Sequence, residues 1–148
     1  MGKYYKGKYT VKNKAKYKGD YKNVVYRSSW ERAMFRWCDE NPSVVAFNSE
    51  EVIIPYICQT DNRQHRYFMD VYFKLTNGQE YLIEIKPRSQ TLPPKTPKKR
   101  SKKYVTEALT YIKNQSKWTA AQEYANRRNM VFEVWDEHKL RSLGMKIL

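Results

Sequence analysis

The sequence predicts an α/β domain with a mixed sheet, in the order helix, three-strand antiparallel meander, helix, strand and helix. Apolar residues at helical spacing follow Ser28 and return between residues 104 and 125. Residues 67–75 and 81–85 are instead rich in aromatic and β-branched side chains. The first pattern is typical of helices that bury one face, and the second is typical of strands.

The first helix should begin near Ser28 and end before Pro42. Ser28 and Glu31 have the spacing of a capping box, in which the two side chains bond to backbone amides at the start of a helix. The apolar residues that follow at helical spacing are Trp30, Met34, Trp37 and Cys38. Strands are expected over residues 52–57, 67–75 and 81–85, and we expect them to form the antiparallel meander.

Residues 87–103 predict a basic, extended loop, because prolines and lysines are concentrated there. Helical spacing resumes beyond the loop, and Ser116 is a candidate cap between two helices. A fourth strand is expected over residues 130–135. Asp136 should cap a final helix that stops at Gly144.

The chain is strongly basic: Lys and Arg number 29 and Asp and Glu 15 among 148 residues, a formal net charge of +14. This charge favours a polyanion as partner. Nucleic acid is favoured over membrane, because no apolar run approaches the roughly 18 residues that span a bilayer. No signal peptide opens the chain, so we expect a soluble, intracellular protein.

Two parts are expected along the chain. Residues 1–22, rich in Lys and Tyr, predict a flexible basic arm that contacts phosphates, or alternatively a tail that only adds solubility. Residues 23–148 should form one domain.

Neither the cysteines nor the histidines predict a metal site. Cys38 and Cys58 lie far apart in the sequence, in segments that suggest a helix and a strand, so both should be buried thiols. His65 and His138 lack a neighbour at metal-ligand spacing. His65, beside Arg66, is instead a candidate phosphate contact.

The pair Asn77-Gly78 indicates a turn between the second and third strands, and the turn decides which residues face each other. A two-residue turn would place apolar Val71 opposite acidic Glu84. A three-residue loop over 76–78, with Gly78 left-handed, places Asp70 opposite Glu84. We prefer this register because it leaves one face apolar, formed by Met69, Val71, Phe73, Tyr81, Ile83 and Ile85.

In that register Asp70, Glu84 and Lys86 share one side of the two strands. Opposed β-carbons lie about 4.5–5.5 Å apart, so the two carboxylates could reach one ion. Mg²⁺, for which Mn²⁺ can substitute, prefers such oxygen ligands and promotes phosphodiester hydrolysis. Lys86 would orient the attacking water or stabilise the charge of the transition state. The alternative is that both acids are solvated residues on an exposed sheet face.

Glu31 has two interpretations. It either completes the capping box with Ser28 or supplies a third carboxylate, because it lies at the edge of the helix arc that faces the sheet. The two roles do not exclude each other.

Asp70 followed by Glu84-Ile85-Lys86 resembles the PD-(D/E)XK signature of the restriction-endonuclease-like superfamily. Residues 26–31, 66–70, 83–87 and 118–122 resemble a narrower family, the head completion nucleases of T-even-type tailed phages, which is related to the transposase-subunit nucleases. The resemblance implies a restriction-endonuclease-like core and catalytic roles for Glu31, Asp70, Glu84 and Lys86, with the three acids as metal ligands. Met69 stands where the named motif has proline.

The resemblance further implies a metal-dependent DNA endonuclease that processes DNA ends during phage head completion, in the virion or the host cytoplasm. Expected partners are DNA and phage head or portal proteins, with no membrane. The alternatives are a structural head protein that binds DNA or the portal without cleavage, and a nuclease for RNA or branched DNA. Residues expected to bind nucleic acid are Arg27, Ser29, His65, Arg66, Lys98, Lys99, Arg100, Lys102 and Lys103.

Overall fold

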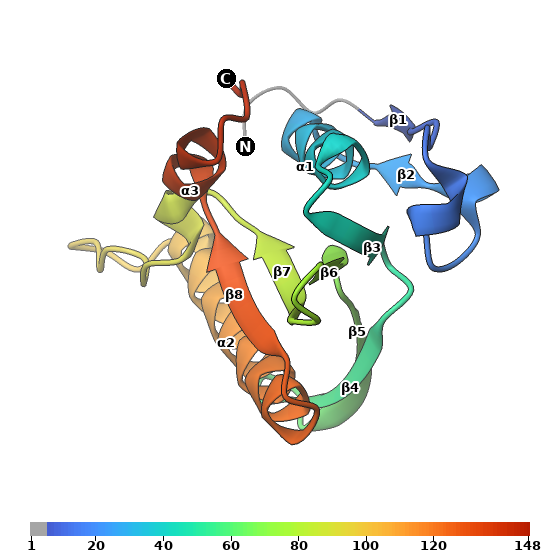
Figure 1. Cartoon of the computed structure of the whole chain (residues 1–148). Helices are drawn as coiled ribbons and strands as arrows, with labels where there is room; N and C mark the ends of the chain where they lie inside the picture. Colours follow the sequence, from blue (N-terminus) through green and yellow to red (C-terminus); the bar gives the residue numbers. More distant parts are fainter. Residues whose placement is uncertain (1–5) are drawn as a thin grey trace.

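A four-stranded mixed sheet with helices packed against it forms the centre of the protein, seen here in a computed structural model that describes residues 6–148 (Figure 1). The helices are α1 (Ser29–Glu40), α2 (Lys102–Arg127) and α3 (Glu137–Ser142), and the short 3-10 helices are η1 (Lys14–Lys16), η2 (Tyr21–Asn23) and η3 (Arg88–Gln90). The strands are β1 (Gly7–Lys8), β2 (Val25–Tyr26), β3 (Val44–Asn48), β4 (Ile53–Cys58), β5 (Arg63–Phe68), β6 (Val71–Leu75), β7 (Glu80–Ile85) and β8 (Val131–Trp135). The predicted α/β class with a mixed sheet is confirmed.

The sheet order is β3-β6-β7-β8, with β8 parallel to β7 and the other neighbours antiparallel. Strands β4 and β5 pair separately, and the β1–β2 pair lies at the start of the chain. The predicted meander is therefore wrong in detail, because its first strand pairs outside the four-stranded sheet. The strand beside β6 is β3, which the sequence analysis did not predict because residues 44–47 form a short, continuous apolar run without alternation.

Strands β3–β4 and β5–β6 form a long β-ribbon that runs through the four-stranded sheet and the β4–β5 pair. The ribbon bends at two places. The ladder continues across the bends, where the Glu50 amide donates to the Met69 carbonyl and the Met69 amide to the Val52 carbonyl, each at 2.9 Å. Glu50 adopts a left-handed φ of 59°, which bends the chain between β3 and β4. The predicted strand over residues 67–75 is correspondingly interrupted at Met69 and Asp70.

The register of β6 and β7 matches the prediction made from a three-residue loop. Tyr72 pairs with Leu82, and the Leu75 amide donates to the Gln79 carbonyl at 2.9 Å. Gly78 closes the loop with a φ of 89°, a conformation that glycine adopts without a side-chain clash. This register sets which side chains of β6 and β7 face each helix.

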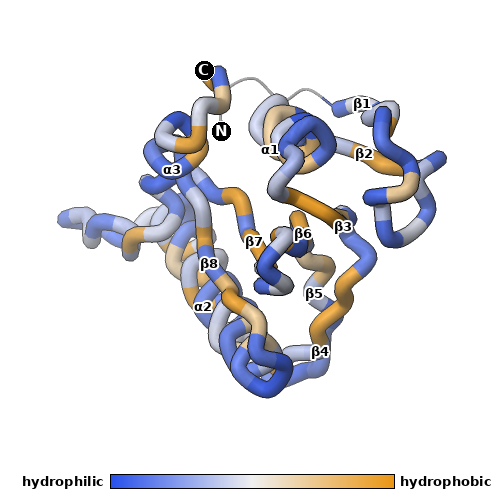
Figure 2. Tube along the Cα trace, viewed as in Figure 1, coloured by the Kyte–Doolittle hydropathy of each residue, from blue (hydrophilic) through white to orange (hydrophobic). Residues whose placement is uncertain are grey.

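Each face of the sheet covers its own apolar core, and Figure 2 shows hydrophobic residues running along β3, β4 and β7. Val71 and Ile83 lie in the core beneath α1, whereas Leu82 lies in the core beneath α2. Met69 also lies in the second core, although it was predicted to share the face of Val71. The bend after β5 resets the alternation of side chains, which explains the difference.

Helices α1 and α3 begin and end as predicted. The Ser28 hydroxyl accepts a hydrogen bond from the Glu31 amide at 3.2 Å, and α1 ends before Pro42. Asp136 caps α3, and Gly144 follows that helix with a φ of 91°. Their boundaries depend on local capping chemistry, which is readable in the sequence.

Helix α2 is continuous over 26 residues, so the predicted break at Ser116 is wrong. The Ser116 hydroxyl donates to the Ile112 carbonyl at 3.1 Å within the helix and caps nothing. Residues 91–101 form a loop that projects from the molecule (yellow in Figure 1), whereas Lys102 and Lys103 already belong to α2. Within residues 6–148, no helix combines the length and apolarity needed to cross a membrane.

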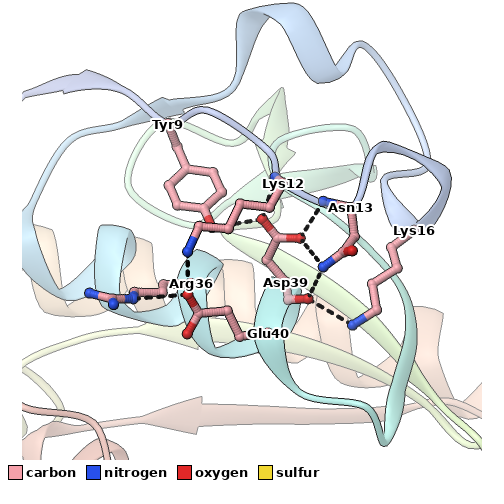
Figure 3. Close-up of polar contacts among 7 residues, drawn as sticks. All are labelled: Tyr9, Lys12, Asn13, Lys16, Arg36, Asp39 and Glu40. Carbon is pink, nitrogen blue, oxygen red and sulfur yellow. Dashed lines mark hydrogen bonds and ion pairs between the residues drawn. The ribbon is translucent and has the colours of Figure 1, made fainter.

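Residues 6–22 pack on the domain, so the prediction of a flexible arm over 1–22 is wrong for this part. Val11 and Tyr17 are buried in the core beneath α1. The Asp39 carboxylate, from α1, accepts hydrogen bonds from the Tyr9 hydroxyl and the Lys12 amide at 2.8 Å and from the Asn13 amide at 3.0 Å (Figure 3). The remainder of the predicted arm, residues 1–5, lies outside the described residues.

Candidate active site

Asp70 lies at the bend between β5 and β6, where its half-buried side chain points toward the end of β7. One carboxylate oxygen accepts a hydrogen bond from the Ile85 amide at 2.8 Å. The bend thus places the acid beside β7, directly next to the residue that precedes Ile85.

That residue is Glu84, which is buried with 4% of its surface exposed. Its Oε2 atom accepts a hydrogen bond from the Tyr67 hydroxyl, and its Oε1 atom lies 3.8 Å from the Lys86 ammonium. Glu84 and Lys86 are two residues apart and lie on one side of the chain, as strand alternation predicts. Lys86 is therefore directed toward the acids.

Glu31 reaches the same region from the first turn of α1. It is only 8% exposed, and its Oε1 atom accepts a hydrogen bond from the Arg27 amide at 2.6 Å. A standard capping box would use the amide of the cap residue Ser28, so the contact is displaced by one residue. Glu31 therefore accepts a backbone amide at the start of α1, and its carboxylate still lies beside the acids of the strands.

The charges of Glu84 and Glu31 affect the protonation of Asp70. Burial raises the pKa of Asp70 well above its usual range, and the negative charges of Glu84 and Glu31 raise it further, against the opposing effects of the Ile85 amide and Lys86. Burial also raises the pKa of Glu31, with Glu50 and Glu84 contributing in the same direction. Both acids therefore hold their protons more tightly in this site than they would in water.

Two residues of this site, Tyr67 and Lys117, were not predicted from the sequence. Burial, followed by the charge of Glu84, raises the pKa of Tyr67, so its hydroxyl stays protonated and donates. Lys117 comes from α2 and places its ammonium 5.2 Å from the centre of the Tyr67 ring. No local pattern identifies either residue, because Tyr67 joins the site through its bond to Glu84, and Lys117 through the packing of α2 on β4, the strand paired with β5.

Burial lowers the pKa of Lys117, and the positive charges of Lys113 and Lys86 also lower it. The carboxylates of Glu84 and Asp70 act in the opposite direction. Lys117 thus adds a second ammonium group near the cluster, through its contact with the ring of Tyr67, whose hydroxyl bonds to Glu84.

Two predicted nucleic-acid contacts lie near the start of α1. Arg27 donates its backbone amide to Glu31, while its exposed guanidinium forms an ion pair with Glu50. Ser29 is the first residue of α1 and lines a surface depression together with Arg32 and Arg36. Arg27 therefore contacts the carboxylate cluster through Glu31, whereas Ser29 lies in the depression lined by Arg32 and Arg36.

The other predicted contacts lie elsewhere. His65 bonds to Asp61 at 2.8 Å on the β4–β5 hairpin, and the exposed Arg66 lies over the Phe68 ring at 5.4 Å from its centre. The structure does not bring either residue to Glu31. The remaining basic residues are exposed on the 91–101 loop and the first turn of α2, namely Lys98, Lys99, Arg100, Lys102 and Lys103.

Comparison with known proteins gives two matches. Residues 41–137 match the model of the TnsA-like endonuclease N-terminal domain. The chain is also 43% identical over 146 residues to the head completion nuclease of Enterobacteria phage T4. The matched stretch covers 96% of this chain and 97% of that protein. The first match includes Asp70, Glu84, Lys86 and Lys117, whereas Glu31 precedes it.

Proposed function

This chain belongs to the TnsA-like endonuclease family, and from that premise we propose that it is a Mg²⁺-dependent DNA endonuclease acting in phage head completion. The T4 relative, matched over nearly its whole length, supports the head-completion role. The observation that carries the proposal is the meeting of two acids beside Lys86: Asp70 bonds to the Ile85 amide next to Glu84, and Glu84 lies 3.8 Å from the Lys86 ammonium.

The residues of the cluster fit a hard divalent cation. Carboxylate oxygens are the ligands that Mg²⁺ and Mn²⁺ prefer, and burial with mutual repulsion makes the cluster costly without a cation. Asp70 and Glu84 would hold the ion, with Glu31 as the third acid. When bound, such an ion polarises a phosphoryl oxygen and lowers the pKa of a water molecule.

The chain's own residues position the reaction. Lys86 lies 3.8 Å from Glu84 and presents a positive charge where negative charge develops on the phosphate oxygens. The Tyr67 hydroxyl fixes Glu84 in one orientation by bonding to its Oε2 atom, and the Ile85 amide does the same for Asp70. Lys117 supplies a second ammonium on the α2 side. Fixed groups of this kind need little rearrangement during reaction.

We further infer a restriction-endonuclease-like core of the PD-(D/E)XK type. Helix α1, the bent ribbon, β7, α2 and β8 follow the order helix, three strands, helix and strand, if β3–β4 and β5–β6 each count as one bent strand. Asp70, Glu84 and Lys86 would then take the places of the two acids and the lysine of that motif.

The charge of the chain supports DNA as the substrate. A net charge of +14 and the exposed basic residues of the 91–101 loop favour contact with phosphates. The loop follows β7 and η3, so it leaves the domain from the end of the strand that carries Glu84. We propose the phage head as the place of action, within the virion or the host cytoplasm, and head proteins as partners.

A plasmid-cleavage assay with Mg²⁺ tests this function. We expect the native protein to nick or linearise the plasmid, and Asp70→Asn and Glu84→Gln to lower the rate at least about 10²-fold. Glu123→Gln, which removes an exposed carboxylate on α2, is the matched control and should cleave normally. DNA binding measured without Mg²⁺ should survive in all four proteins.

Two outcomes would contradict the proposal. Undiminished cleavage by both acid variants would remove the cluster from the chemistry. Tight DNA binding by the native protein with no cleavage in Mg²⁺ or Mn²⁺ would favour a structural head protein.

A further inference from the structure

Three metal-ligating side chains meet at the tip of the β4–β5 hairpin, away from the carboxylate cluster. Cys58, Asp61 and His65 each offer one ligand atom, and these three atoms all lie within 4.8 Å of one another. We expected no partner for His65 at metal-ligand spacing, but Asp61 lies beside it. The missed signal was Asp61, which completes the spacing Cys-x₂-Asp-x₃-His.

The hairpin backbone builds this arrangement. Cys58 ends β4, and its carbonyl accepts the Asn62 amide at 2.7 Å. Asn62 has a left-handed φ of 54°, which lets the turn close in four residues. Asp61 accepts the Arg63 amide at 2.9 Å through Oδ1, so its other oxygen faces His65. The turn therefore fixes Asp61 before any ligand is considered.

Strand pairing aligns the other two ligands. His65 pairs with Tyr56, and its ring stacks on the Tyr56 ring with centroids 5.6 Å apart. Tyr56 and Cys58 are two residues apart on β4 and share one face, so the imidazole and the thiol lie on the same side of the hairpin. The His65 Nε2 atom is 2.8 Å from Asp61, and the Cys58 Sγ atom is 3.0 Å from the Thr60 hydroxyl.

The cluster is open to solvent on one side. Cys58 is only 2% exposed, whereas the side chains of His65 and Asp61 are 36% and 39% exposed. An ion held here would rest on the buried sulfur and face water, which gives it an entry path and room for a water ligand. Cys58 is a free cysteine and therefore has its sulfur available.

We propose that Cys58, Asp61 and His65 bind a zinc-like transition-metal cation, with water as the fourth ligand. Sulfur and imidazole ligands select Zn²⁺ over Mg²⁺, unlike the all-oxygen set of Asp70, Glu84 and Glu31. Ligand atoms of a tetrahedral zinc site lie about 3.3–3.8 Å apart, so small side-chain rotations complete the geometry.

The ion would stabilise the hairpin against α2. The Gln59 amide, inside the same turn, donates to the Ser116 hydroxyl of α2 at 3.3 Å. Lys117, the next residue of that helix, lies beside the carboxylate cluster. The proposed role is therefore structural, and it does not depend on the nuclease function proposed above.

Co²⁺ and Zn²⁺ titrations of the full chain test the proposal. The Asp70→Asn background is used so that the carboxylate cluster does not compete for the ion. We expect one equivalent of Co²⁺ to produce a thiolate-to-cobalt charge-transfer band, and Zn²⁺, but not excess Mg²⁺, to displace it. Cys58→Ser should remove the band, while Cys38→Ala, which changes the other buried thiol, should keep it.

His65→Gln provides a second arm, because its partly exposed side chain can be changed with little risk to folding. It should weaken Zn²⁺ binding at least tenfold, since even the outer-shell partners of metal ligands are worth about 10–100-fold. Absence of the band at one equivalent of Co²⁺ would overturn the proposal. An unchanged Zn²⁺ affinity in folded His65→Gln would also overturn the proposal.

Discussion

A carboxylate oxygen of Asp70 accepts the backbone amide of Ile85 at 2.8 Å, and this bond joins the bend of one strand to the end of its neighbour. Glu84 directly precedes Ile85, so the bond places the two acids together where β6 begins and β7 ends. Buried like charges destabilise a fold unless something offsets them. The arrangement therefore has consequences for stability as well as for catalysis.

Asp70→Asn should stabilise the protein in the absence of metal. Burial and the charges of Glu84 and Glu31 raise the pKa of Asp70 in the folded state above its unfolded value. The folded state thus holds the proton more tightly, and this contribution to stability is present at low pH and lost as pH rises through the raised pKa. In EDTA at neutral pH, the variant should melt a few degrees higher in thermal denaturation, about 2–4 °C per kcal/mol.

The same melts with Mg²⁺ supply the control. Mg²⁺ should raise the melting temperature of the native protein and leave Asp70→Asn nearly unchanged, because ligand binding stabilises only a state that holds the ligand. Glu123→Gln should behave like the native protein in both buffers. Lower stability of Asp70→Asn than native protein throughout the pH range in EDTA would contradict the argument.

Lys86→Gln should lower the cleavage rate about 10²–10³-fold with little change in DNA affinity. Its ammonium lies 3.8 Å from Glu84 and is placed to act on charge that develops only in the transition state. Single-turnover cleavage and equilibrium binding separate these two effects. Lys139→Gln, which changes an exposed lysine of α3 with no predicted DNA contact, should keep its rate. Equal losses in the two variants would mean that only net charge matters.

Tyr67→Phe should slow cleavage about tenfold and raise the Mg²⁺ concentration needed for half-maximal rate. The lost hydroxyl orients Glu84 through its Oε2 atom, so the acid would occupy several orientations and grip the ion less well. Tyr72→Phe is the matched control, since its hydroxyl donates to Glu80 outside the cluster. A Mg²⁺ dependence that is unchanged in Tyr67→Phe would show that this hydroxyl does not position the acid.

Asp39→Ala should release residues 6–22 from the domain. The Asp39 side chain is buried and accepts from Tyr9, Lys12 and Asn13, so removing it leaves several donors without partners (Figure 3). We expect a loss of about 3 kcal/mol in denaturant unfolding, with faster amide exchange over residues 9–17.

The neighbouring Glu40 offers a matched control for Asp39. It bonds to Lys12 and Arg36 on the exposed side of the same helix end (Figure 3). Glu40→Ala should cost less than about 1 kcal/mol, because exposed ion pairs contribute little. Similar losses in the two variants would refute the anchoring role of Asp39.

Local signals in the sequence predicted part of this molecule well. The capping residues Ser28 and Asp136 fixed the starts of α1 and α3, and Gly78 fixed the register of β6 with β7. Each of these depends on backbone groups only a few residues away. The register in turn predicted that Asp70 and Glu84 lie together before any tertiary contact was known.

Contacts between distant segments were not predictable from the same signals. Tyr17, predicted to belong to a flexible arm, packs its ring edge against Phe47 thirty residues away, with centroids 5.2 Å apart. Ser116 is a good capping residue, but α2 runs through it, and its hydroxyl bonds back to the Ile112 carbonyl within the helix. Lys117 reaches the candidate site because α2 packs on β4, the strand paired with β5. Tertiary packing therefore decided the places of Tyr17 and Lys117.

The central claim, that Asp70 and Glu84 hold one divalent cation, is tested most directly by a crystal structure with Mn²⁺ located from its anomalous scattering. We expect Mn²⁺ bound by oxygens of both carboxylates at about 2.0–2.4 Å, between the distances typical of Mg²⁺ and Ca²⁺. Saturating Mn²⁺ that binds neither acid, or only one of them, would contradict it.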